Sequence, residues 1–85
     1  MTEITSMQRN RLAGLAVSER GFVFDPQSGQ SFSANGVALA LLALLRAGAD
    51  EEAATSRLAA QFDQRPALVR PAVAAFLRQL TRYFP

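Results

Sequence analysis

Two residue types that carry much of protein chemistry, cysteine and histidine, do not occur in this chain of 85 residues. Without cysteine there is no disulfide framework and no thiolate nucleophile. Without histidine the most common general base and the most common metal ligand are missing, and a zinc finger is excluded. There is no glycine-rich phosphate loop, and no serine has a histidine to activate it. We therefore predict that the protein is not an enzyme and holds no metal ion and no cofactor.

Lysine is absent as well. The nine basic residues are all arginines, and with seven acidic residues they give a net charge of +2. These arginines are scattered along the chain, whereas nucleic-acid-binding proteins typically carry a dense basic cluster. The composition therefore makes nucleic acid an unfavoured partner.

Long apolar segments are also missing. The longest uninterrupted one, residues 37–45, is less than half as long as the roughly 20 residues that a transmembrane helix needs. Residues 1–17 lack the apolar stretch after a basic start that marks a secretory signal peptide. We expect a soluble, cytoplasmic protein that does not act at a membrane.

The apolar content, 49% of the residues, is enough for the core of one small domain. Residues 1–10 are polar and show no period, so we expect a flexible N-terminus there. The remaining residues, 11–85, are then expected to form a single domain.

Three short strands are predicted in the first half of the chain. Residues 12–18 are a weak candidate, residues 21–25 a better one, and residues 30–33 a third. Residues 26–29, with the sequence PQSG, are typical of a tight turn, so the strands are expected to form an antiparallel meander. Large aromatic side chains are most simply explained as core residues. This interpretation covers Phe22, Phe24, Phe32 and Phe76.

The second half of the chain predicts three helices. Asn35 is a good N-cap for a first helix over residues 36–47, and Gly48 is a good residue to end it. This helix is apolar nearly all round. We therefore expect the other helices and the sheet to cover most of it, and a second copy of the chain to cover the remainder in a homodimer.

The other two helices each show one apolar stripe. Asp50 can cap the second helix, whose stripe is Ala54, Leu58 and Phe62. The third helix should start just after Pro66, and Pro71 predicts a local distortion if it begins before Leu68. The apolar face of this helix is Val69, Val73, Phe76, Leu77, Leu80 and Phe84.

The predicted order of elements is β-β-β-α-α-α. A three-stranded sheet this small must pack one face on the helices. The prediction is therefore an α+β domain with a winged helix-turn-helix-like layout, in which a three-stranded antiparallel meander is followed by three helices.

Three segments in this order resemble a known family. They are FSANGVALALLALLRAG at residues 32–48, DEEAATSRLAAQF at residues 50–62 and VRPAVAAFLRQLTRYF at residues 69–84. Over residues 17–84 the chain resembles the PqqD-like family, which is related to the D component of pyrroloquinoline quinone (PQQ) biosynthesis. The resemblance fits the PQQ pathway and equally a relative in another gene cluster.

The resemblance implies a peptide chaperone, or recognition element, for ribosomally synthesised peptides. Such a protein binds the leader segment of a precursor peptide and presents it to a modifying enzyme, such as a radical SAM enzyme. The leader is expected to add as a strand to the open edge of the third strand, in a groove walled by the third helix.

The residues of this expected peptide site lie in two segments. The edge strand carries no proline and no charge, which are the common guards of natural sheet edges. Strand addition also needs an apolar wall beside that edge, and the third helix can supply it. The expected peptide-binding residues are Gln30, Ser31, Phe32, Ser33, Val69, Val73, Phe76, Leu77 and Leu80.

Two alternatives remain open at this point. A DNA-binding winged-helix regulator would read bases with the third helix. That helix offers only Arg65 and Arg70 near its start, while Arg78 and Arg82 come late and are explained either as a solvated face or as a clamp for acidic peptide residues. The other alternative is a dimeric protein-interaction adaptor without a peptide ligand.

Overall fold

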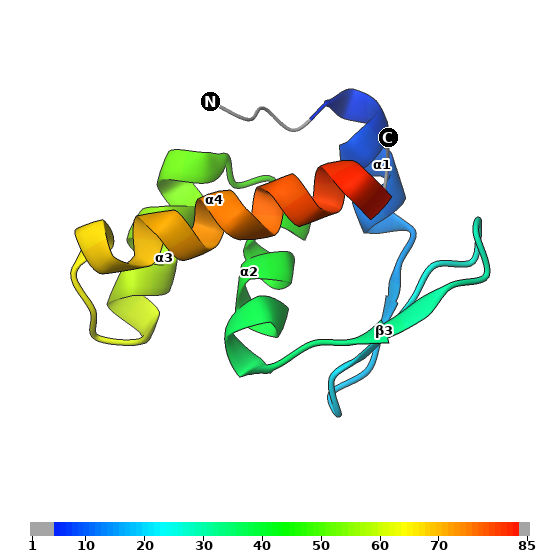
Figure 1. Cartoon of the computed structure of the whole chain (residues 1–85), viewed down its shortest axis with the longest axis horizontal. Helices are drawn as coiled ribbons and strands as arrows, with labels where there is room; N and C mark the ends of the chain where they lie inside the picture. The colour runs from blue at the N-terminus through cyan, green and yellow to red at the C-terminus, as the bar shows by residue number, and fades with distance from the viewer. Residues whose placement is uncertain (1–4, 84–85) are drawn as a thin grey trace.

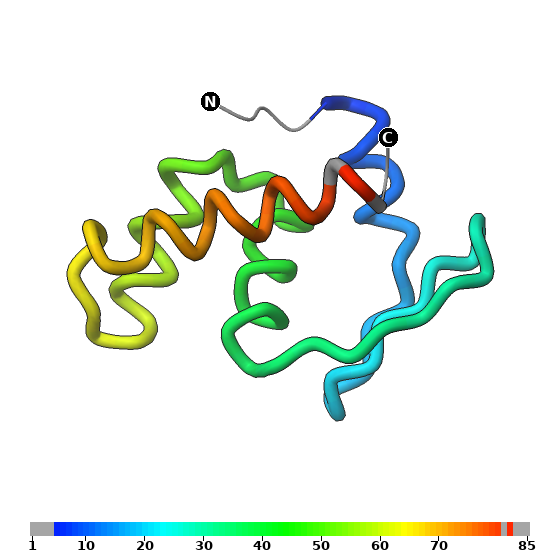
Figure 2. Tube along the Cα trace, in the orientation of Figure 1, coloured from blue at the N-terminus to red at the C-terminus, as the bar shows by residue number. Residues whose placement is uncertain are grey.

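The molecule consists of a small sheet at one end and a group of helices beside it (Figure 1). A computed structural model describes residues 5–83. The elements, in chain order, are α1 (Ser6–Ala13), β1 (Ala16–Val17), β2 (Phe22–Phe24), β3 (Ser31–Ser33), α2 (Gly36–Arg46), α3 (Glu51–Gln61) and α4 (Pro66–Tyr83). From β1 onward this is the predicted β-β-β-α-α-α order with a winged-helix-like layout. Figure 2 shows that the trace of β3 leads directly into α2.

Helix α1 was not predicted. Thr5 caps it through a reciprocal pair of hydrogen bonds: Thr5 Oγ1 accepts from the Gln8 N–H at 3.1 Å, and Gln8 Oε1 accepts from the Thr5 N–H at 2.9 Å. Residues 6–10, where a flexible N-terminus is expected, are therefore helical, while residues 1–4 lie outside the described part. Leu12, expected in a strand, is a fully buried residue of this helix.

Two arginines hold α1 and α2 together. The Arg9 guanidinium donates to the carbonyl oxygens of Leu45 at 3.3 Å and Ala49 at 3.2 Å, next to the end of α2. Arg46 donates in the other direction, to the Ala13 carbonyl at 3.5 Å. A helix as short as α1 is marginal alone, so these contacts, together with Leu12, stabilise it.

The sheet has the predicted antiparallel order β1-β2-β3. Val23 lies opposite Phe32 and is fully buried, so this face of the sheet points toward the helices. Side chains alternate along a strand, and Phe22 and Phe24 therefore lie on the opposite face, where they are 61% and 44% exposed. The interpretation of these two residues as core is wrong. Phe32 is partly buried against the core, as expected.

Both ends of α2 and the start of α3 follow from the predicted caps. Asn35 Oδ1 accepts from the Ala38 N–H and Asp50 Oδ1 from the Ala53 N–H, both at 2.8 Å. Gly48 has a φ of +102°, and the next N–H, of Ala49, donates to the Leu44 carbonyl, which is the Schellman pattern that ends a helix.

Helix α4 begins at Pro66, before Leu68, so Pro71 lies inside it. Pro66 is well placed, since the first residue of a helix has no intrahelical acceptor for its N–H. Pro71 has no N–H to donate to the Ala67 carbonyl, which loses one helical hydrogen bond. Pro71 is exposed, and the helix continues past it to Tyr83.

The core lies mainly among the helices, and Val23 adds a side chain from the sheet. It collects Leu12, Leu15, Val23, Leu41, Leu42, Leu45, Ala49, Ala54, Leu58, Ala59, Val69, Val73, Leu77 and Leu80. Helix α2 buries three of these leucines, but Val37 and Ala43 on the same helix stay exposed. Coverage of that side by a second copy stays a prediction. Phe62, expected in the buried stripe of α3, follows the last turn of that helix and is 39% exposed.

Candidate functional site

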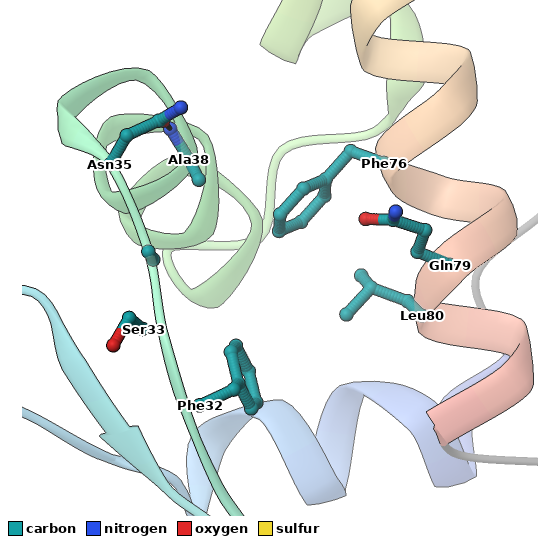
Figure 3. A pocket seen from close by; sticks show the side chains of 8 residues that line it. Phe32, Ser33, Asn35, Ala38, Phe76, Gln79 and Leu80 are labelled. Atoms are coloured by element: carbon teal, nitrogen blue, oxygen red, sulfur yellow. Dashed lines mark hydrogen bonds between the residues drawn. The ribbon is translucent and has the colours of Figure 1, made fainter.

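A pocket of about 350 Å³ lies between β3, the start of α2 and the second half of α4. In Figure 3 Phe32 points from β3 into this space, and Phe76 and Leu80 point into it from α4. The side chain of Ser33 points away from it, as expected for the neighbour of Phe32 on a strand. The pocket is lined by Phe32, Ser33, Ala34, Asn35, Ala38, Phe76, Gln79 and Leu80.

Local structure explains why these residues meet. Phe32 shares the helix-facing side of the sheet with Val23, its cross-strand partner. Phe76 and Leu80 are four residues apart on α4 and so lie on one side of that helix. Asn35 is placed by its cap on α2, directly after β3. The pocket is therefore the joint between the sheet and the helices.

Of the nine expected peptide-binding residues, four line this pocket: Phe32, Ser33, Phe76 and Leu80. Gln30 and Ser31 are exposed at the edge of the sheet. Val69, Val73 and Leu77 are buried in the core, so they offer a ligand little surface. They lie on the part of α4 that packs on α3 and the remaining core. An apolar stripe in the sequence does not show which of its residues face α3 and which face the sheet.

The pocket also contains four residues that sequence reasoning missed: Ala34, Asn35, Ala38 and Gln79. Two signals were available. Gln79 is three residues after Phe76, so it occupies a neighbouring position on the surface of α4. Ala38 is three residues after the Asn35 cap and thus lies in the first turn of α2.

The outer edge of β3 has no partner strand in residues 5–83. The Asp25 N–H donates to the Gln30 carbonyl at 2.8 Å, and the Ala34 N–H to the Gly21 carbonyl at 2.7 Å. Hydrogen-bonded and non-hydrogen-bonded pairs alternate in an antiparallel ladder. The backbone N–H and C=O groups of Ser31 and Ser33 therefore point away from β2, toward the open edge.

The pocket is electrically neutral, since the eight described residues that line it include no charged side chain. Arg78 and Arg82 are exposed, and the 3.6-residue helix repeat places them on the side of α4 away from the core. Arg70 lies 3.6 Å from Glu52 in an exposed ion pair. In the described part of the chain no group of three acidic side chains could hold a metal ion.

The carboxylate of Asp25, directly after β2, is held in place by several hydrogen bonds. Asp25 is buried and accepts from Arg11 at 2.6 Å, from Ser28 Oγ at 2.8 Å and from the Gln27 N–H at 3.0 Å. Burial acts to raise the pKa of Asp25, but these hydrogen bonds and the charge of Arg11 outweigh it and lower the pKa. Asp25 therefore ties the hairpin to α1 and serves the fold.

Comparison with protein families gives a match to the model for "Coenzyme PQQ synthesis protein D (PqqD)" over residues 20–83, most of the chain. The chain belongs to the PqqD family. Searches of curated proteins and of solved structures found no match. None of the helices in residues 5–83 is long and apolar enough to cross a membrane.

Membership of the PqqD family indicates the general role of the protein. Proteins of this family are non-catalytic accessory proteins related to PQQ biosynthesis, with a role in peptide binding. The matched range includes the whole of β2, β3, α2, α3 and α4, and thus every residue that lines the pocket.

Proposed function

We propose that this PqqD-family chain binds the leader segment of a ribosomally synthesised precursor peptide as a strand added to β3. It then presents the precursor to a modifying enzyme, such as a radical SAM enzyme. The observation that carries the proposal is the open edge of β3 lying directly beside the neutral pocket. Strand addition uses main-chain hydrogen bonds for affinity and a pocket for selectivity.

The ladder determines how such a peptide would lie. Ser31 and Ser33 each offer one N–H and one C=O to the added strand. The peptide residue opposite Phe32 then has its side chain on the same face as Phe32, because laterally aligned residues of neighbouring strands share a face. That single side chain enters the pocket between Phe32 and Phe76.

The pocket favours an apolar side chain at this position. Its walls combine aromatic and aliphatic groups with the polar side chains of Asn35 and Gln79, and they carry no charge. An unpaired charge would lose its hydration there without gaining a partner. Its volume of about 350 Å³ lies at the lower end of the range for ligand pockets, which suits one or two side chains.

A DNA-binding role has less support. A recognition helix usually contacts bases with residues near its N-terminus. At the start of α4 that region presents Arg65, Leu68, which is 60% exposed, and Arg70, which pairs with Glu52. The open edge of β3 and the neutral pocket beside it are features that peptide binding would use and that base reading by α4 does not require.

The proposal is tested by removing one edge donor. Ser31→Pro deletes an N–H that faces the open edge and leaves the β2–β3 hydrogen bonds in place, whereas Ser31→Ala retains the N–H and serves as the matched control. We expect Ser31→Pro to weaken binding of the leader of a short peptide encoded beside the gene by about 2- to 10-fold, the value of one hydrogen bond. Fluorescence anisotropy measures the binding, and circular dichroism checks the fold. A folded Ser31→Pro protein that binds as tightly as Ser31→Ala would exclude strand addition at this edge.

A further inference from the structure

The face of the sheet that points away from the helices carries an exposed aromatic pair. Phe22 and Phe24 are two residues apart on β2 and lie side by side on this face. Their cross-strand neighbours on β3 are Ser33 and Ser31, respectively. On the other side of β2, Ala16 lies opposite Phe24. All five side chains are exposed in the part of the chain that the structure describes, and none is charged.

This aromatic pair is close to the open edge. Phe22–Ser33 and Phe24–Ser31 are non-hydrogen-bonded pairs, the arrangement in which cross-strand side chains are closest. Among residues 5–83, Ser33 and Ser31 are the cross-strand neighbours that lie between these phenylalanine rings and the outer edge of β3. A serine is too small to cover the ring beside it.

A peptide strand at that edge places two of its side chains on this face. This follows from the alternation that sends its middle side chain into the pocket: the two flanking residues, opposite Ser31 and Ser33, point the other way. Side chains alternate between the two faces in parallel and in antiparallel strands, so a peptide added parallel to β3 would also place its flanking side chains on this face. The flanking side chains stand two strand spacings from β2, about 9.6 Å. This separation is longer than the roughly 7–8 Å between diagonal neighbours on adjacent strands, so only aromatic and long aliphatic side chains that lean over the serine from both sides can meet.

We propose that Phe22 and Phe24 are specificity-determining residues for the bound peptide. They select apolar side chains at the two peptide positions that flank the residue in the pocket. This inference rests on the proposed function, and it adds a second recognition surface on the opposite face of the sheet. The ligand is then an extended segment with three consecutive apolar residues, the middle one in the pocket and the outer two on the aromatic pair.

The experiment starts from a phage-displayed library of random dodecapeptides, selected on the immobilised full chain. A selected peptide is synthesised with a fluorescent label, and its affinity is measured for wild type, for Phe22→Thr/Phe24→Thr and for Ser31→Pro. Threonine keeps the strand propensity of the two positions and removes the rings. Leu68→Thr is the matched control, because it removes an exposed apolar side chain far from the sheet. If the double variant does not fold, Phe22→Thr alone carries the test, since Phe22 is the more exposed of the two.

We expect the double threonine variant to bind about 2- to 30-fold more weakly than wild type, where the upper figure is the value of two directly opposed cross-strand contacts, and Leu68→Thr to bind normally. Changing the two flanking peptide residues to serine should weaken binding to wild type and have little effect on the double variant. The inference would be overturned if the peptide changes weakened binding equally for wild type and the double variant, or if the double variant bound as tightly as wild type. Weaker binding by Ser31→Pro would in either case still support strand addition. Enrichment of no peptide, or full affinity of Ser31→Pro, would instead overturn the proposed function itself.

Discussion

Replacing Gly21 by alanine is expected to destabilise the joint between the sheet and α2. Gly21 has a φ of +93°, a conformation that costs other residues about 1–3 kcal/mol. A Cβ at this position would lie 2.6 Å from the carbonyl oxygen of Ala34, which is backbone and cannot rotate away. The shift that relieves this contact would also disturb the 2.7 Å hydrogen bond from the Ala34 N–H to the Gly21 carbonyl, worth about 0.5–1.5 kcal/mol.

Together these terms predict a loss of about 2–4 kcal/mol of unfolding free energy for Gly21→Ala. For a domain of this size that corresponds to a fall in Tm of about 8–30 °C. Urea denaturation followed by circular dichroism measures the free energy, and a thermal scan measures Tm. Because Ala34 also lines the pocket, peptide affinity is expected to fall with stability.

Two other glycines separate the contributions. Gly29 has a φ of +75° and nothing within 4 Å of its Cβ position, so Gly29→Ala reports backbone strain alone. Gly36 lies in the first turn of α2 with no positive φ and open space, so Gly36→Ala should be neutral or stabilising by up to about 1 kcal/mol. We expect Gly21→Ala to be more destabilising than Gly29→Ala by about 1–2 kcal/mol. Equal stability of these two variants would refute the contact between Gly21 and Ala34 as the cause.

Two further predictions concern stability. The pKa of Asp25 is lowered in the folded state, so its contribution is present above the unfolded pKa of about 3.9 and is lost as the pH falls through the lower folded value. The difference in Tm between wild type and Asp25→Asn should thus be larger at pH 6 than at pH 3, and a difference that does not change with pH contradicts the role of the ion pair. Asp63, which follows α3, has a φ of +53°, so Asp63→Gly should raise the unfolding free energy by about 0.5–1 kcal/mol after the greater freedom of unfolded glycine is subtracted. Urea denaturation checks this, and an unchanged or lower midpoint argues against strain at residue 63.

The parts of the fold that were predicted correctly depend on local signals. Asn35, Gly48 and Asp50 act within one turn of their own position, so their sequence context was sufficient to place the ends of α2 and the start of α3. The meander was predictable for the same reason, from a turn sequence between two runs of strand-forming residues. Helix α1 also had such a signal, the capping pair of Thr5 and Gln8. The sequence of this helix is mostly polar and shows no apolar period, so the helix was not recognised.

The errors arose where tertiary packing decides. The segment Phe22-Val23-Phe24 is apolar throughout, so its alternation contains no polar residue to show which face is buried. In the structure Val23 shares the inner face of the sheet with Gly21 and Asp25, two residues to either side, which are also buried. The two rings outside were therefore missed as a surface.

The pocket was only half predictable for a related reason. An apolar stripe shows that α4 packs against a core. It does not show which residues of the stripe lie inside the core and which lie at the pocket beside β3. Val73 and Leu77 lie in the core, while Phe76 lies at the border with β3. The open edge of β3 could be anticipated from sequence, but the assignment of its free groups to Ser31 and Ser33 needed the register of the ladder.

Strand addition at the edge of β3 can be observed by amide hydrogen exchange, followed by NMR with and without the leader of a peptide encoded beside the gene. We expect slower exchange at Ser31 and Ser33 when the peptide is present, because their N–H groups become hydrogen-bonded to the added strand. The N–H of Phe32, which faces β2, should change little. Peptide binding that leaves the exchange of Ser31 and Ser33 unchanged, or protects residues remote from β3 instead, would contradict strand addition at this edge.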